Sequence, residues 1–215
     1  MNATYFDIET GPLHDEELCK IIPPFDRDAV KCGNLKDQNK IDEKLKKAEL
    51  NHFAEARDKA ALEATTGKVL AIGIEDSGGF NAITGKETHI LKTFWEGFTC
   101  SDTTYIGFNI FLFDLPFMIK RSWQNRVAVP MSVRDGRWWG NRFIDLRDMW
   151  QLGDRKAKGS LDVICRHLSI EGKNGNGKDF ARLFELNPAK ALEYLSNDLR
   201  MTRQVHERLA GFEDV

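Results

Sequence analysis

The sequence has no long apolar run and no clustered cysteines, and both absences limit what the protein can be. Its 215 residues contain no stretch of about 18 apolar side chains, so we expect no transmembrane helix. The N-terminus lacks a basic segment followed by an apolar one, so we expect no signal peptide. The cysteines lack metal-type spacing and are interpreted as reduced thiols of a cytoplasmic protein that does not act at a membrane; they are Cys19, Cys32, Cys100 and Cys165.

The sequence also lacks a strong excess of either charge, since the net charge is -2. The distribution of charge is more informative than its sum. Residues 120–158 contain ten Lys or Arg and four Asp or Glu, a local net charge of +6 that leaves -8 on the rest of the chain. Such a basic segment, in a chain that also carries grouped acids, suits a phosphate-containing substrate. A solvated basic surface explains the charge of this segment equally well.

Two carboxylates stand two residues apart in the N-terminal stretch Tyr5–Gly11. If this stretch is a strand, its period of two places Asp7 and Glu9 on one face. Like charges near a core repel each other and lose hydration, and cations relieve both costs. The pattern therefore indicates a divalent-metal site with carboxylate oxygens as ligands. The alternative is a strand end with two solvated acids.

Further acidic residues stand in two other contexts. Asp114 follows a predicted strand at the start of a predicted helix, where the helix dipole favours a carboxylate. Tyr194 and Asp198 are four residues apart in the last predicted helix and share a face. The alternative for Asp114 is a simple helix-start residue. The alternative for the second pair is an exposed acid beside a half-buried tyrosine.

The apolar pattern predicts strands and helices in an order typical of an α/β protein with a central mixed sheet flanked by helices. The first strand ends before Gly11-Pro12, and residues 13–35 are expected to be irregular. The predicted strands are 3–9, 68–75, 89–94, 103–108 and 143–146; the predicted helices are 36–64, 115–124, 160–168 and 187–210, with one helical turn at 181–184.

Three motifs in the order Asp7-Ile8-Glu9, Asn109 to Asp114 and Tyr194 to Asp198 resemble those of the DEDD 3′–5′ exonucleases, tyrosine subclass (DEDDy). The flanking residues are similar to the exonuclease domain of family B DNA polymerases. This resemblance implies an RNase H-like fold and a single 3′–5′ exonuclease domain over residues 1–215. The flanking stretches that carry the resemblance are Phe6–Thr10, Gly107–Asn109, Phe113–Pro116 and Ser160–Asp162.

The resemblance implies a site with two divalent metal ions, Mg²⁺ or Mn²⁺. Asp7 would bridge both ions, Glu9 and Asp198 would help to hold the ion that activates water, and Asp114 would support the second. Tyr194 would orient the attacking water, because a free tyrosine pKa of about 10 makes a poor base at neutral pH.

The resemblance also implies contacts with the substrate. The backbone at Thr10 and Gly11 would approach the terminal nucleotide, and Phe108 and Asn109 are further candidates. Phe108 could equally be an ordinary core aromatic. The expected reaction is metal-dependent 3′–5′ hydrolysis of single-stranded DNA. An exoribonuclease and a catalytically silent nucleic-acid-binding module remain alternatives, since no residue pattern distinguishes a 2′-hydroxyl.

Two departures from the family pattern carry expectations of their own. Residues about 14–66 are expected to form a helical insertion after the first strand, either an arm that limits which ends enter or a surface helix without a role. The sequence carries no polymerase portion, so we expect a stand-alone nuclease or a subunit with a replication or repair partner. Basic and aromatic side chains that could contact nucleic acid, or lie in a hairpin and a solvated loop, are Arg137, Trp138, Trp139, Arg142, Lys173 and Lys178.

Overall fold

The computed structural model describes residues 3–134, 142–154, 156–157, 159–172 and 180–211. The chain divides into two compact units, one formed by residues 1–10 and 69–215 and the other by residues 11–68. Within the described part, no helix is both long and apolar enough to cross a membrane.

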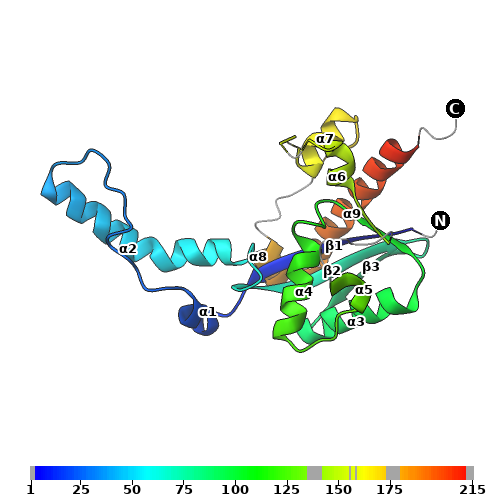
Figure 1. Cartoon of the computed structure of the whole chain (residues 1–215), viewed down its shortest axis with the longest axis horizontal. Helices are drawn as coiled ribbons and strands as arrows, with labels where there is room; N and C mark the ends of the chain where they lie inside the picture. The colour runs from blue at the N-terminus through cyan, green and yellow to red at the C-terminus, as the bar shows by residue number, and fades with distance from the viewer. Residues whose placement is uncertain (1–2, 135–141, 155, 158, 173–179, 212–215) are drawn as a thin grey trace. The chain divides into compact units, whose positions relative to one another are not determined.

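A five-stranded sheet in the order β3-β2-β1-β4-β5 organises the first unit (Figure 1). β1 is parallel to β4, β4 is parallel to β5, and β2 and β3 form an antiparallel hairpin, so the sheet is mixed as predicted. The strands are β1 (Ala3–Pro12), β2 (Gly67–Asp76), β3 (Gly79–Thr84), β4 (Thr104–Gly107) and β5 (Phe143–Asp145).

Helices flank this sheet. The order of helices and strands along the chain confirms the predicted α/β class. The predictions near 115–124, 160–168 and 187–210 correspond to α4, α7 and α9, and the predicted turn near 181 is the longer helix α8. The helices are α3 (Glu87–Cys100), α4 (Asp114–Gln124), α5 (Met131–Arg134), α6 (Leu146–Gln151), α7 (Leu161–His167), α8 (Phe180–Leu186) and α9 (Pro188–Ala210).

Alternation along β1 separates an apolar face from the face that carries the acids. The ring of Phe6 lies 5.3 Å from that of Phe94 on α3, in a cluster of buried aromatic rings that includes Phe143 on β5. Tyr5 faces the other way and packs in a cluster with Leu199 and other buried residues of α9. Because Asp7 and Glu9 follow Tyr5 at steps of two, they share the face that α9 covers.

α9 begins at a capped end and packs against the sheet through its apolar side chains. Asn187 caps the helix by accepting a hydrogen bond from the Lys190 N–H at 3.1 Å, and Pro188 occupies the first turn, as predicted. Leu195 and Leu199 are fully buried, and a Cβ added to Gly73 of β2 would lie 2.8 and 2.9 Å from their side chains. Glycine at this position therefore allows the helix that carries Asp198 to approach the sheet.

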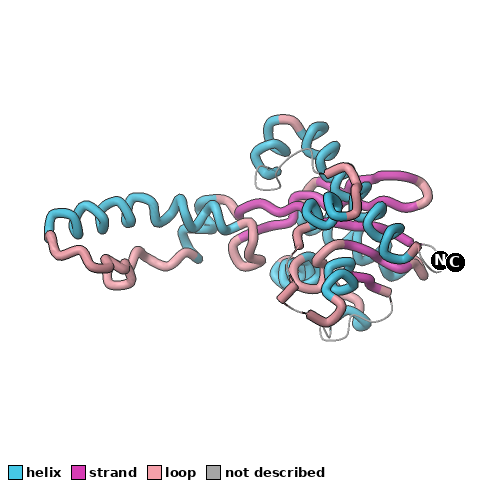
Figure 2. Tube along the Cα trace, turned by 90° about the horizontal axis from the view of Figure 1, so that it is seen from above, coloured by secondary structure: helices cyan, strands magenta, loops and turns pink. Residues whose placement is uncertain are grey.

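The second unit consists of α1 (Asp15–Ile21), α2 (Gln38–Ala60) and the segment that joins them, which runs beside α2 (Figure 2). Asp37 caps α2 through the Asn39 N–H at 3.0 Å. The backbone N–H of Leu13 donates to the carbonyl of Thr66 at 2.9 Å, so the chain leaves and returns at neighbouring points. The small core contains Leu13, Leu18 and Ala60, with Ile22 and Phe53 partly buried against it.

One predicted strand, residues 89–94, is wrong, because these residues belong to the helix α3. Ile90, Leu91, Phe94, Trp95 and Phe98 are all buried and follow helical spacing. A short apolar run does not distinguish a buried strand from a buried helix, and here the buried apolar positions continue beyond the predicted strand to Phe98. The antiparallel edge strand is instead β3, which was not predicted.

The expectations around the insertion also need correction. β1 does not end before Gly11-Pro12 but continues to Pro12, its last residue. Residues 15–21, expected to be irregular, form α1, whose first turn holds three acids beside the positive helix end. The short helix α6, directly after β5, was also missed.

Candidate metal centre

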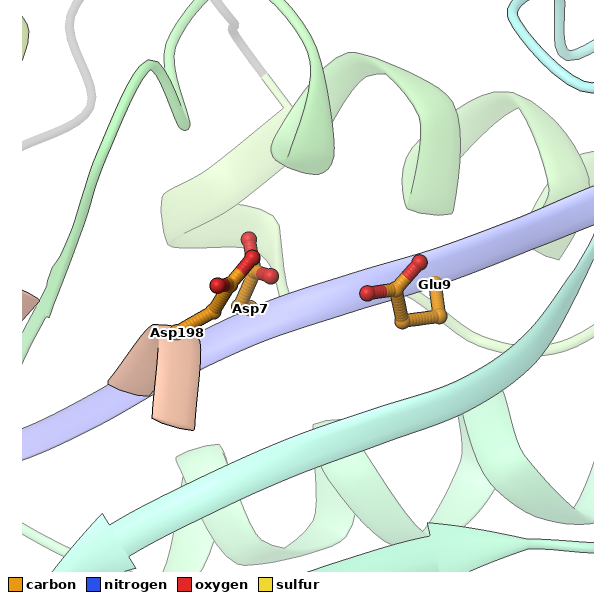
Figure 3. Close-up of side chains that lie close together, drawn as sticks. All are labelled: Asp7, Glu9 and Asp198. Carbon is orange, nitrogen blue, oxygen red and sulfur yellow. The ribbon is translucent and has the colours of Figure 1, made fainter. Parts of the chain in front are cut away.

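Carboxylates from β1 and α9 meet on the covered face of the sheet. One ligand oxygen from each of Asp7, Glu9 and Asp198 lies within 4.8 Å of the other two (Figure 3). Glu9 and Asp198 are 8% and 5% exposed, and Asp7 is half-buried. Carboxylate oxygens are the ligands that Mg²⁺ and Mn²⁺ prefer, and oxygens on opposite sides of such an ion lie about 4 Å apart. The donor set and its spacing therefore fit a divalent cation.

Asp114 begins α4 and is attached to the same strand. It is 2% exposed, and its Oδ1 accepts a hydrogen bond from the backbone N–H of Ile8 at 3.1 Å. Burial raises the pKa of Asp114 well above its usual value, and the charge of Asp7 raises it further, while the N–H of Ile8 acts in the opposite direction. A cation beside Asp7 and Asp114 would favour the ionised form of both. The structure thus places the fourth predicted carboxylate next to Asp7.

Tyr194 lies one turn before Asp198 on the buried face of α9. It is 7% exposed and packs with Ala71, Leu195 and Phe180, whose ring centroid is 6.4 Å from its own. Tyr194 and Asp198 thus share a face of the helix, as the spacing predicted. The buried positions of Asp198 and Tyr194 argue against the alternative of an exposed acid beside a half-buried tyrosine.

The predicted substrate contacts divide into three kinds. Thr10 and Gly11 continue β1 beyond Glu9. Phe108 is half-buried and packs against the cluster around Ile106, which favours the core alternative for this ring. Asn109 has a left-handed backbone with φ of 65°, an arrangement that asparagine tolerates better than most residues. Its N–H donates to Asp145, the last residue of β5, and its side-chain oxygen accepts from Arg147 of α6.

Asp145 and Arg147 hold the backbone and side chain of Asn109 in place where β4 and β5 end. The sequence analysis predicted neither residue as part of the site. Asp145 is 3% exposed and accepts hydrogen bonds from the N–H groups of Asn109, Phe111 and Arg147 at 2.8–2.9 Å. Burial raises the pKa of Asp145, and these three donors oppose that shift. The Arg147 Nη1 donates to Oδ1 of Asn109 at 2.8 Å. A signal existed, because an acid ending a strand next to a parallel strand lies at the edge where ligands bind.

The basic and aromatic candidates of residues 137–139, and Lys173 and Lys178, lie outside the described residues. Arg142 is described, and its Nη2 donates to the carbonyls of Phe98 at 2.9 Å and Ser101 at 2.7 Å. Its guanidinium also lies 4.0 Å from the ring centroid of Phe98. Arg142 therefore caps the C-terminal end of α3, which favours a structural role for this side chain.

The mixed sheet, its helices and the acidic face define an RNase H-like fold. A solved structure of the family B DNA polymerase from the hyperthermophilic archaeon Pyrobaculum calidifontis matches 99% of this chain, with a TM-score of 0.64 and 14% sequence identity. The chain spans 25% of the length of that polymerase. At this identity, the match shows the fold alone.

A family model described as a predicted 3′–5′ exonuclease related to the exonuclease domain of PolB matches residues 60–214. The chain therefore belongs to this family. The matched range contains Asp114, Tyr194 and Asp198, whereas Asp7 and Glu9 precede it and are connected to the site by the geometry of β1. A search of curated protein sequences finds no significant match.

Proposed function

We propose that this protein is a metal-dependent 3′–5′ exonuclease that removes nucleotides from single-stranded DNA. The observation that supports this most directly is the meeting of Asp7, Glu9 and Asp198 within 4.8 Å, although about 190 residues of chain separate β1 from Asp198. Family membership supports the direction of digestion, and the spacing of the carboxylates supports the dependence on metal.

The chain's own residues have distinct roles in this proposal. Asp7 would hold both ions, Glu9 and Asp198 would help to hold one of them, and Asp114 would support the other. When bound, the two ions would activate a water molecule and stabilise the charge that develops on the scissile phosphate. The Tyr194 hydroxyl orients the attacking water. The backbone at Thr10 and Gly11 and the side chain of Asn109 hold the terminal nucleotide.

Electrostatics makes the dependence on metal strict. Carboxylates grouped at one place repel a polyanionic strand, and three of them, Glu9, Asp114 and Asp198, are buried. Neutralisation by divalent ions removes this repulsion and provides Lewis acids at the same point. Substrate binding and chemistry should therefore both require the metal.

The test uses single-stranded DNA labelled at either end, incubated with Mg²⁺, with Mn²⁺ or with EDTA. A 3′ label should appear at once as a mononucleotide, and a 5′ label should appear in a ladder of gradually shorter strands. EDTA should stop both reactions, and Asp198→Asn is the matched inactive variant. Release of a 5′-labelled mononucleotide first, or activity in EDTA, would contradict the proposal.

Matched RNA distinguishes the exoribonuclease alternative with the same labels and metals. Faster digestion of RNA than of DNA would replace the proposed substrate but keep the proposed chemistry. Absence of digestion of either polymer, with metal-dependent binding retained, would support a binding module in place of an enzyme.

A further inference from the structure

Arg147 is a cation that the fold places at the carboxyl edge of the sheet. The parallel registers pair Tyr5 with Ile106 and Gly107 with Asp145. Asp7, Asn109 and Arg147 each lie two residues beyond one of these positions, at the edge where ligands bind in sheets with parallel strands. The segment from Asn109 to Asp114 joins the partner of Arg147 to a predicted metal ligand.

The guanidinium of Arg147 is held in place but its charge is not neutralised. Its backbone N–H is bound by Asp145, and its Nη1 donates to Asn109. It forms no ion pair with any carboxylate of the described residues, and the Asp145 carboxylate is occupied by three backbone donors. Its Nε is buried without a partner in the described part of the chain.

This arrangement is costly for stability and suits an anion. A buried donor without an acceptor and a half-buried cation without a counter-charge both destabilise the folded state. An arginine that is positioned in advance, with N–H groups still available, is well suited to bind phosphate. The Nη2 group is the end of the guanidinium that donates to none of the described residues and is not among the buried unpartnered atoms.

We propose that Arg147 binds a phosphate of the substrate strand on the 5′ side of the bond that is cleaved. This inference rests on the proposed function. In the proposed mechanism, the metal ligands on β1 and α9 lie at the scissile phosphate. Arg147 lies beyond Asn109, so it would contact a phosphate further along the substrate strand. Its contribution is to substrate binding and not to the chemical step.

The test compares Arg147→Gln with Arg208→Gln, which removes the same charge from an exposed position in the last turn of α9. Arg208 is ten residues from Asp198, or about 15 Å along a helix. Two substrates are used: a single-stranded DNA oligonucleotide, and the p-nitrophenyl ester of thymidine 5′-monophosphate, whose only phosphate is the scissile one. KM and kcat are measured with Mg²⁺ between about 50 and 200 mM NaCl.

For Arg147→Gln we expect KM for the oligonucleotide to rise roughly tenfold with little change in kcat. The slope of log(kcat/KM) against log[salt] should become shallower by about 0.7, the value for one phosphate contact on a single strand. Hydrolysis of the p-nitrophenyl ester should match that of wild type. Arg147→Lys should restore the salt slope, because it keeps the charge.

Each other result has a definite meaning. Equal losses on both substrates would show that Arg147 only positions Asn109 and Asp114, and would overturn the inference. Kinetics like those of Arg208→Gln would also overturn it. If wild-type protein cleaves neither substrate, the proposed function itself is wrong, which is a separate outcome.

Discussion

The two compact units of this protein differ in how their cores are packed. The first unit carries the predicted metal ligands, and the second unit is the predicted insertion. In the first unit, the acids stand on a strand and a helix that are packed by fully buried residues such as Phe6, Leu195 and Leu199. In the second unit, the core consists of Leu13, Leu18 and Ala60, with Ile22 and Phe53 partly buried against it. A reaction that needs fixed ligand positions requires the first kind of packing.

Polar contacts show the same contrast. The Glu87 carboxylate of the first unit receives both Nε and Nη2 of Arg121 at 2.9 and 2.7 Å, and also the backbone N–H of Val69 at 2.8 Å. The ion pair of Arg57 with Asp15 in the second unit is just as short, at 2.7 Å, but both side chains are more than half exposed. Exposed pairs contribute only about 0–1 kcal/mol, so equal distances do not imply equal stabilisation.

The largest effect should come from Asp7, the proposed shared ligand of the two metal ions. Asp7→Ala should lower the single-turnover rate at least about 10³-fold, because both proposed ions would lose a ligand. The melting temperature without metal should be unchanged or higher, since a repulsive carboxylate has been removed. Arg57→Gln in the second unit should leave the single-turnover rate unchanged. A turnover of Asp7→Ala near that of wild type would end the metal assignment.

The contrast in polar contacts predicts a difference in stability. Asp145→Ala leaves the N–H groups of Asn109, Phe111 and Arg147 without their acceptor and should lower the free energy of unfolding by about 2–4 kcal/mol. Asp145→Asn should be milder, because its carbonyl oxygen still accepts. Asp15→Ala, the exposed counterpart, should cost less than about 1 kcal/mol. Urea denaturation measures all three, and an equal cost for Asp15→Ala and Asp145→Ala would remove the contrast.

Tyr194 and Asp198 should differ although they share a helix face. Tyr194→Phe removes only the hydroxyl that is proposed to orient water and keeps the packing against Ala71 and Phe180. Asp198→Ala removes a predicted ligand. Single-turnover rates should therefore decrease in the order wild type, Tyr194→Phe, Asp198→Ala. The reverse order of the two variants would show that their roles were assigned wrongly.

The two ends of the insertion lie next to each other, so the insertion can be deleted. Since the Leu13 N–H meets the Thr66 carbonyl, a short turn can replace residues 14–66. We expect this variant to fold and to cleave short single strands, because all the predicted metal ligands lie in the first unit. We also expect the ratio of rates on recessed duplex ends and single strands to change. Unchanged rates on both substrates would exclude a role of the insertion in selecting ends.

The smallest effect concerns His206, whose Nδ1 lies 3.0 Å from the Tyr5 hydroxyl. Burial lowers the pKa of His206 below its usual value, so the folded protein binds this proton less readily than the unfolded chain. The stability associated with neutral His206 is present above the unfolded pKa of about 6.5 and is lost as pH falls toward the folded value. Thermal melts of wild type and His206→Gln should differ in this pH window. Parallel pH profiles would contradict the prediction.

Local signals in the sequence predicted the elements that carry the acids. Period-two spacing placed Asp7 and Glu9 on one face of a strand, and four-residue spacing placed Tyr194 and Asp198 on one face of α9. The cap at Asn187 and the proline after it marked the start of this helix. These features depend on neighbouring residues, so they can be recognised without the tertiary structure.

Other features could not be predicted because their partners are distant in the sequence. Whether residues 89–94 form a strand or a helix depended on burial against Phe6 and its neighbours, since the apolar run suits both. The acceptor role of Asp145 depends on backbone donors 34 and 36 residues away.

The sequence by itself determined the fold class and the three acidic motifs, since residue type and local spacing are sufficient for both. Only the tertiary structure decided that the oxygens of β1 and α9 meet within 4.8 Å, and that Arg147 lies at the same edge of the sheet without a carboxylate partner among the described residues. The physical reason is that convergence depends on strand register and on how closely a helix can pack. Here the absence of a side chain at Gly73 allows that packing.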